Sequence, residues 1–241
     1  MTADAAAPSL TVVIPIHDEE GIVERSVSEL LSELRQRPWP FEIILAENGS
    51  HDSTRDIAKR LSIEHESVRV VTHPEADYGT ALRLGISAAA GTFVVCDEID
   101  LCNLDFYDRA LRLLETDAAE VVVGSKVCAG ARDHRPWLRR AGTRAISFLL
   151  RTVTGYPGTD THGLKALRRA RLLPIVARCV TTNDLFASEL LVRADRAGLR
   201  VVEIPIDVRE KRPPTKGLLR RVPRALLQLA QLGRALRTEQ R

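Results

Sequence analysis

The chain alternates short apolar runs with segments of helical periodicity, and this alternation limits the fold more than any other feature. Strand-like runs are expected at Leu10–Ile16, Phe41–Ala46, Val68–His73, Thr92–Asp97 and Glu120–Lys126. Between them, apolar residues recur at helical spacing over Glu19–Arg35, Ser53–Leu61, Gly79–Ala90 and Leu104–Leu114. Strands that alternate with helices build a mainly parallel sheet covered on both faces, so we predict an α/β fold.

The second half of the chain is less regular. Its expected elements are a helix over Trp137–Val153, a strand at Gly163–Leu167, a helix over Asp184–Ala197 and a strand at Arg200–Pro205. With 241 residues, 44% of them apolar, the chain can bury one large core without a linker. We therefore expect a single domain over residues 1–208, followed by a C-terminal segment over residues 209–241.

That C-terminal segment is strongly basic, with ten Lys and Arg against two acidic residues. An apolar stripe at helical spacing runs along it, formed by Leu219, Val222, Leu226, Leu229 and Leu236, with Gly233 on the same side. This pattern predicts a basic amphipathic helix. Two alternatives stay open: the helix lies on an anionic membrane surface, or it packs its stripe on its own domain. No recognition motif accompanies the charge, so nucleic acid is not an expected partner.

The cysteines and the hydropathy pattern bear on the compartment. The four cysteines form no CxxC pair and no zinc-type spacing with histidine, and no signal peptide precedes them. No apolar run is long enough to span a bilayer. We expect a reduced, cytoplasmic protein that contacts the inner face of the membrane peripherally if the basic segment binds lipid.

An acidic cluster, Asp97-Glu98-Ile99-Asp100, stands where the fourth apolar run ends. In an open α/β sheet, ligand-binding groups gather at the carboxyl ends of strands. Along an extended chain Glu98 and Asp100 share one face, and two such carboxylates suit Mg²⁺ or Mn²⁺ that bridges a diphosphate. Asp97 with Asp100 is a second possible register for the metal ligands. The alternative is a solvated acidic turn that caps a helix.

The first two strands also end in polar groups. The first ends in Pro15-Ile16-His17-Asp18-Glu19-Glu20, and Glu47 ends the second, ahead of a Gly turn. This edge of a sheet is where a base and ribose are hydrogen-bonded. Asp18 and Asp52 are typical helix N-caps, whereas Glu47 is poorly placed as a cap, so we favour a ligand role for it.

Taken together, these residues resemble the family 2 glycosyltransferases, and within them the polyprenyl-phosphate (dolichol-phosphate) sugar synthases. The resemblance extends over nearly the whole chain. The matching segments, in order, are Pro15 to Glu19, Glu47 to Thr54, Gly79 to Gly91, Glu98 to Leu101, Val123 to Lys126, Asp160 to Arg168 and Glu189 to Pro205. Glu98 replaces the first acid of the family's D-x-D, and Glu47-Asn48 replaces its Asp pair. The Q-x-x-R-W motif of processive members is absent from the sequence.

The resemblance implies a GT-A fold and an inverting transfer of a sugar from a nucleotide-diphosphate donor to a lipid phosphate. It assigns the donor site to Pro15, His17, Glu19, Glu47, Gly79, Asp97 and Glu98, and the divalent cation to Glu98, Asp100 or Asp97. Catalytic roles fall to Asp100 and Lys126. The cations expected to meet the acceptor phosphate are Arg139, Arg140, Lys211, Arg212 and Lys216, with Lys126, Arg144 and Lys165 as further candidates.

Two other functions remain open. The first is transfer to a soluble hydroxyl acceptor, for which Asp184 or Glu189 is the expected general base, with His162 as a further candidate. The second is a catalytically weak protein that binds nucleotide sugars, favoured only by the altered D-x-D motif.

Overall fold

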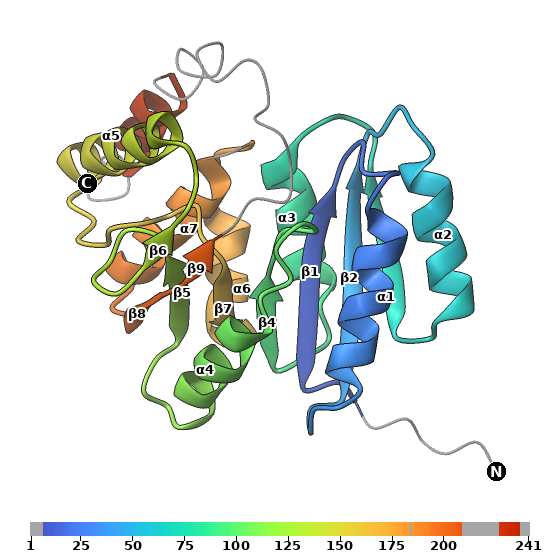
Figure 1. Ribbon diagram of the computed structural model, residues 1–241. Helices are drawn as coiled ribbons and strands as arrows, with labels where there is room; N and C mark the ends of the chain where they lie inside the picture. Colours follow the sequence, from blue (N-terminus) through green and yellow to red (C-terminus); the bar gives the residue numbers. More distant parts are fainter. Residues whose placement is uncertain (1–6, 184, 209–226, 237–241) are drawn as a thin grey trace.

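The computed structural model describes residues 7–183, 185–208 and 227–236, and a seven-stranded sheet forms its centre (Figure 1). The strands are β1 (Leu10–Ile16), β2 (Phe41–Asn48), β3 (Val68–His73), β4 (Phe93–Cys96), β5 (Val121–Ser125), β7 (Lys165–Arg168) and β8 (Val201–Pro205). Their order across the sheet is β3-β2-β1-β4-β7-β5-β8. Strand β7 runs antiparallel to β4 and β5, and the other neighbours pair in parallel. The expected mainly parallel α/β fold is confirmed.

Seven helices connect these strands in the described part of the chain. They are α1 (Val23–Leu34), α2 (Thr54–Glu64), α3 (Tyr78–Ala88), α4 (Leu104–Glu115), α5 (Trp137–Thr154), α6 (Arg169–Arg178) and α7 (Leu185–Arg196). A further helix covers residues 227–236. The sequence did not predict α6, because Pro174 lies inside it and proline normally ends a helix. It also did not predict the short pair β6 (Arg132–Asp133) and β9 (Asp207–Val208).

Two apolar layers hold the helices on the sheet. Alternate residues of a strand face opposite sides, so Val12 and Ile14 of β1 join one buried cluster and Val13 joins the other. Helices α1, α2 and α4 complete the first layer, and α3, α6 and α7 complete the second. A sheet buried on both faces explains why its strands read as nearly continuous apolar runs.

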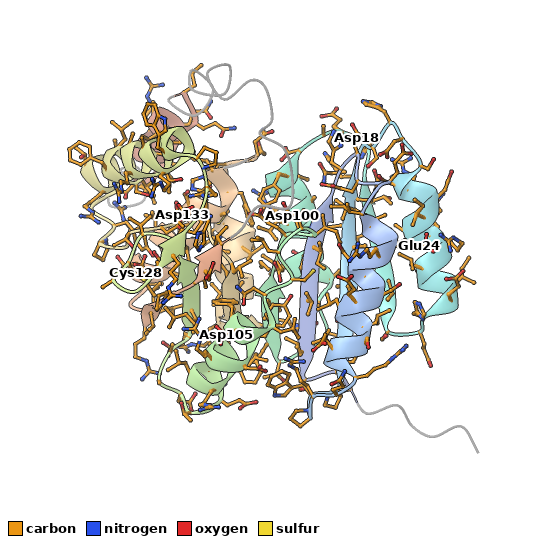
Figure 2. The ribbon with its side chains drawn as sticks, viewed as in Figure 1. Asp18, Glu24, Asp100, Asp105, Cys128 and Asp133 are labelled. Carbon is orange, nitrogen blue, oxygen red and sulfur yellow. The ribbon has the colours of Figure 1, made fainter. Side chains whose placement is uncertain are left out.

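The carboxyl ends of β1, β2, β4 and β5 meet at one edge of the sheet, because these strands run in the same direction. Antiparallel β7 begins at that edge, where Lys165 lies opposite Cys96 and Val123. In Figure 2 the labelled Asp18 and Asp100 lie in the upper half of the molecule, toward this edge, whereas Asp105 lies in the lower half. The topology therefore brings the candidate residues to one end.

The helix over residues 227–236 packs on the domain. Leu229, Leu232 and Leu236 are buried in the second apolar layer. Arg196 of α7 donates to the carbonyl of Leu236 (3.3 Å) and to that of Thr154 (3.1 Å), which ties this helix to the end of α5. For this part of the basic segment, the structure supports the alternative in which the stripe packs on its own domain. Leu219, Val222 and Leu226 lie outside the described residues, and the division at residue 208 stays a prediction.

None of the helices in the described ranges is both long enough and apolar enough to cross a bilayer.

Candidate active site

The loops that follow β1 and β2 are joined by hydrogen bonds between side chain and backbone. The carboxylate of Asp18 accepts from the His51 N–H (2.8 Å), and that of Glu20 accepts from the Ser53 N–H (3.0 Å). In return, the Glu19 N–H donates to the Thr54 hydroxyl (2.6 Å). His17 is half-buried, and its Nδ1 lies 2.7 Å from the Asn48 carbonyl oxygen. The loops after β1 and β2 therefore form one hydrogen-bonded surface that carries His17 and Glu19, called here the shelf. Pro15 lies in β1, next to this surface.

Glu47 stabilises the loop after β2, which is part of this shelf. Its carboxylate is fully buried, accepts from the Ser50 N–H (2.7 Å) and pairs with Arg55 (2.8 Å). The turn that it closes contains Gly49 with φ of +64°, where a Cβ would lie 2.8 Å from the backbone of the β3–α3 loop. A direct contact between Glu47 and a nucleotide stays a prediction, and its visible contacts organise the turn.

Gly79 lies at the start of α3 and lets this helix approach the segment before α7. A Cβ at Gly79 would overlap the backbone of Asn183 and the side chain of Phe186. Asp77 caps α3 by accepting from the Thr80 N–H (2.9 Å), and it also accepts from the Asn183 N–H (2.8 Å). Gly79 is thus needed for close packing beside the site, and its contact with nucleotide stays a prediction.

The acidic cluster forms a turn and does not continue the strand. Strand β4 ends at Cys96, and the Leu101 N–H donates back to the Glu98 carbonyl (2.9 Å). The expectation that Glu98 and Asp100 share one face of an extended chain is therefore wrong. The reason is that the buried carboxylate of Asp97 bonds the loop backbone at Glu98 (2.6 Å) and Asn103 (3.3 Å), which closes the turn.

Asp97 itself is held inside the protein. The fully buried hydroxyl of Tyr107 donates to its second oxygen at 2.5 Å, and burial raises the pKa of Asp97 to about 7. Because both of its oxygens bond to the loop or to Tyr107, we propose Glu98 and Asp100 as the metal ligands. Tyr107 could not be singled out in the sequence, because it occupies an ordinary core position of α4.

The donor set fits a hard divalent cation. Mg²⁺ and Mn²⁺ are commonly held by one or two carboxylates together with substrate phosphates, and a complete protein cage is unnecessary. Glu98 and Asp100 supply two carboxylates at the end of β4, and no cluster of three or more potential ligands occurs among the described residues. This combination suits a cation that completes its coordination with a diphosphate.

Two buried lysines and an aspartate lie beside the acidic loop. Asp160 is fully buried; it accepts from the backbone N–H of Lys126 (3.1 Å) and of His162 (2.9 Å), and the Lys126 ammonium lies 3.9 Å away. Burial alone would raise the pKa of Asp160, but the charge of Lys126 and these two N–H groups outweigh burial and lower it.

Lys165 is the second of these lysines. Its ammonium donates to the Gly163 carbonyl (2.7 Å), and burial lowers its pKa although Asp160 and Glu98 act in the opposite direction. We expect a cation that is buried near Glu98 to place positive charge close to a donor diphosphate. Lys165 was a sequence candidate for the acceptor phosphate, but its burial was not expected, because it follows from the antiparallel insertion of β7.

The other expected catalytic residues are placed differently. Glu189 is fully buried on α7, where it accepts from the N–H groups of Val180 and Thr181 and pairs with Arg193 at 2.6 Å. These contacts anchor the loop before α7 and occupy both carboxylate oxygens of Glu189. A role for Glu189 as general base stays a prediction. His162 is half-buried, with Nδ1 3.2 Å from the Thr161 hydroxyl.

The residues expected to meet the acceptor phosphate are only partly described. Arg140 is exposed on α5. Asp184, Lys211, Arg212 and Lys216 lie outside the described residues, as does the side chain of Arg139.

Comparison with known proteins identifies the family. Residues 11–175 match the profile of Glycosyl transferase family 2, so the chain belongs to this family and is a glycosyltransferase. An uncharacterised glycosyltransferase of Mycobacterium tuberculosis is 31% identical over 201 residues, which cover 83% of this chain and 85% of that protein. Dolichyl-phosphate hexose transferase of Haloferax volcanii is 29% identical over 211 residues, which cover 86% of each chain.

A solved structure shows the same fold. It is glucosyl-3-phosphoglycerate synthase from Mycobacterium tuberculosis, in complex with Mn²⁺, UDP and glucosyl-3-phosphoglycerate. The two structures align with a TM-score of 0.66 at 22% identity, over 94% of this chain and 79% of that chain. The GT-A fold is confirmed.

The Asp97–Tyr107 pair gives a pH-dependent prediction. An aspartate whose pKa is about 7 when folded and about 3.9 when unfolded binds more protons in the folded state, so its contribution to stability falls as pH rises between these values. Asp97→Asn removes this contribution. We expect the stability of the wild type relative to Asp97→Asn to decline by up to about 1.4 kcal/mol per pH unit across that window. Denaturant unfolding at about pH 5 and pH 8 measures it; a constant difference would contradict it.

Proposed function

We propose that this glycosyltransferase moves a sugar from a nucleotide-diphosphate donor to a polyprenyl-phosphate-type acceptor at a membrane face. The observation that carries the proposal is an acidic loop next to a buried lysine: Glu98 and Asp100 follow β4, Lys165 lies opposite Cys96 at the end of that strand, and Lys126 lies 3.9 Å from Asp160. Support for the acceptor comes from the Haloferax volcanii dolichyl-phosphate hexose transferase, which matches along most of both chains.

The donor side follows from the fold. The synthase with the same fold was solved with UDP and Mn²⁺, and also with UDP and Mg²⁺. By analogy, the base and ribose would lie on the shelf formed by the loops after β1 and β2, with the diphosphate over the acidic loop. A divalent cation held by Glu98 and Asp100 would supply charge neutralisation on the diphosphate.

The proposed reaction is a displacement at the sugar C1. An oxygen of the acceptor phosphate forms a bond to C1 as the bond from C1 to the diphosphate oxygen breaks, and the nucleoside diphosphate leaves with the electron pair. The acceptor is already an anion, so no general base is required. Lys126 and Lys165 would stabilise the charge that develops on the leaving group, the electrostatic term that is usually the largest in such a site.

A soluble acceptor is the second candidate. The synthase with the same fold was also solved with phosphoglyceric acid, which carries a hydroxyl and a phosphate. Such an acceptor would require a general base. Among the described candidates, Glu189 is occupied as a loop anchor, and this observation favours the phosphate acceptor.

Product analysis tests the proposal. Purified protein is incubated with a panel of radiolabelled nucleotide sugars and Mn²⁺, with polyprenyl phosphate in detergent or with 3-phosphoglycerate as the acceptor. We expect label in the organic phase with polyprenyl phosphate and at least about a hundredfold less transfer to 3-phosphoglycerate. The opposite preference would establish the soluble acceptor. Donor hydrolysis without transfer would contradict both acceptor proposals.

A further inference from the structure

Helix α5 has an unusual composition and an unusual exposed face. Its eighteen residues include Arg139, Arg140, Arg144 and Arg151 and no acidic residue. Eight large hydrophobic side chains are exposed in the described part of the chain, and four of them lie on α5: Trp137 (71% exposed), Phe148 (68%), Leu149 and Val153. Leu149 and Val153 lie on other sides of the helix, and Val153 faces Gly233 of the helix over residues 227–236, whereas Trp137 and Phe148 share one side. Single exposed apolar residues are ordinary, but two large aromatic side chains on one side of a cationic helix indicate a contact surface.

The exposed side chains are ordered along the helix. Trp137, Ala141, Arg144, Phe148 and Arg151 are all exposed and follow one another at intervals of four or three residues, so they form one stripe, called here the α5 face. Trp137 and Phe148 are separated by about 16 Å along this stripe, with Arg144 between them.

The opposite side of α5 fixes it to the domain. Leu150 and Thr154 are buried, and Arg196 holds the Thr154 carbonyl (3.1 Å). At the other end, Arg135 pairs with Asp133 (2.8 Å) and donates to the Thr143 hydroxyl (3.3 Å). Figure 1 shows α5 on the outside of the molecule, beside the helix over residues 227–236. The α5 face therefore points outward on a fixed support.

The position of α5 in the chain connects it to the candidate active site. It lies between Lys126 and Asp160, which form the buried pair beside the acidic loop. Helix α5 begins eleven residues after Lys126 and ends six residues before Asp160, so short segments connect both of its ends to the cation-rich half of the site.

We propose that the α5 face docks on the surface of a bilayer that contains anionic lipid. Aromatic rings at the depth of the headgroups, with arginines reaching the lipid phosphates, are the arrangement by which amphipathic helices lie in a membrane interface. This proposal rests on the proposed function for its purpose, because a polyprenyl-phosphate acceptor is held in a membrane. It assigns the contact to α5, since the described part of the basic C-terminal segment packs its leucines on the domain.

Vesicle flotation tests the α5 face. The full-length chain is mixed with phosphatidylcholine vesicles that contain about 30% phosphatidylglycerol, and bound protein is measured. We expect Trp137→Ser/Phe148→Ser and, separately, Arg144→Glu/Arg151→Glu to lower binding at least tenfold. Matched controls on other helices are Ile63→Ser on α2, a side chain 84% exposed, and Lys59→Glu/Arg112→Glu on α2 and α4. We expect these controls to bind as the wild type does.

Fluorescence provides a second readout that does not depend on activity. The chain has two tryptophans, so Trp39→Phe leaves Trp137 as the only one. We expect its emission to shift to the blue when anionic vesicles are added and to stay unchanged with phosphatidylcholine alone. Emission that is blue before vesicles are added would mean that another protein segment covers Trp137. That result, or equal vesicle binding by the α5 variants and the wild type, would overturn the proposal.

Activity separates this inference from the proposed function. With a short-chain, water-soluble isoprenyl phosphate, we expect Trp137→Ser/Phe148→Ser to transfer sugar at the wild-type rate. With long-chain acceptor in vesicles, its rate should fall in proportion to the lost binding. Equal loss with both acceptors would contradict membrane docking. If no isoprenyl phosphate is glycosylated by the wild type, the proposed function fails, and the flotation result still decides the role of α5.

Discussion

Replacing Asp100 with alanine should reduce sugar transfer by about 10³-fold or more while the protein stays folded. Asp100 lies on the turn after β4 and is buried there. In the proposed function its carboxylate shares a divalent cation with the donor diphosphate, so removing it takes charge stabilisation from the leaving group. Initial rates at saturating donor and Mn²⁺ measure the effect, and circular dichroism and the Tm check the fold.

Asp105→Ala is the matched control. Asp105 is an exposed aspartate in the first turn of α4, paired with Arg109 at 2.9 Å, and Figure 2 shows it below Asp100. We expect this variant to retain wild-type activity. Wild-type turnover by Asp100→Ala, or undiminished activity of the wild type in excess EDTA, would contradict the proposed metal site.

Asp160→Asn should lower the free energy of unfolding by about 3 kcal/mol, because it leaves the buried Lys126 ammonium without its nearby carboxylate. An amide also cannot accept from the N–H groups of both Lys126 and His162, since one of its two polar atoms is a donor. Chemical denaturation at neutral pH measures the loss.

The pH dependence of that loss gives a further check. The pKa of Asp160 is lowered in the folded state, so its stabilising contribution is present above the unfolded pKa and disappears as pH falls below about 4. The difference between wild type and Asp160→Asn should shrink in the same range. Glu24→Gln, at an exposed ion pair with Arg60, serves as the control and should leave the Tm unchanged. An unchanged free energy of unfolding in Asp160→Asn would show that Lys126 does not need Asp160 as its counter-ion.

Much of the sheet could be predicted because its central strands are buried on both faces. Leu10–Ile16 coincides with β1, which is buried at every position, as a nearly continuous apolar run indicates. Val68–His73 coincides with β3, although β3 lies at the edge of the sheet and only Val68 is buried in it. The strand at Gly163–Leu167 was also expected, but its direction was not. Nothing local in Lys165–Arg168 distinguishes an antiparallel strand, because direction follows from the path of α5 around the molecule.

The candidate site was predicted less completely than the sheet. The acidic cluster and Glu47 were located at strand ends, as the structure has them, because polar residues that interrupt apolar runs are visible in a sequence. Their roles depend on neighbours that are distant along the chain. Tyr107 engages Asp97, and Arg55 engages Glu47, and neither partner carries a local signal. The surroundings of Asp97, on which the comparison of the two registers depends, were therefore visible only in the three-dimensional structure, and the metal ligands themselves stay a prediction.

The central claim is that the acidic loop after β4 holds the diphosphate of a sugar donor through a divalent cation. Anomalous diffraction at the manganese edge, from crystals grown with Mn²⁺ and the nucleoside diphosphate that binds best, tests it most directly. We predict an anomalous peak bonded to carboxylate oxygens of Asp100 and Glu98 and to the diphosphate, with the base on the shelf formed by His17 and Glu19. A nucleotide bound at another edge of the sheet, or a manganese peak away from the acidic loop, would contradict the account.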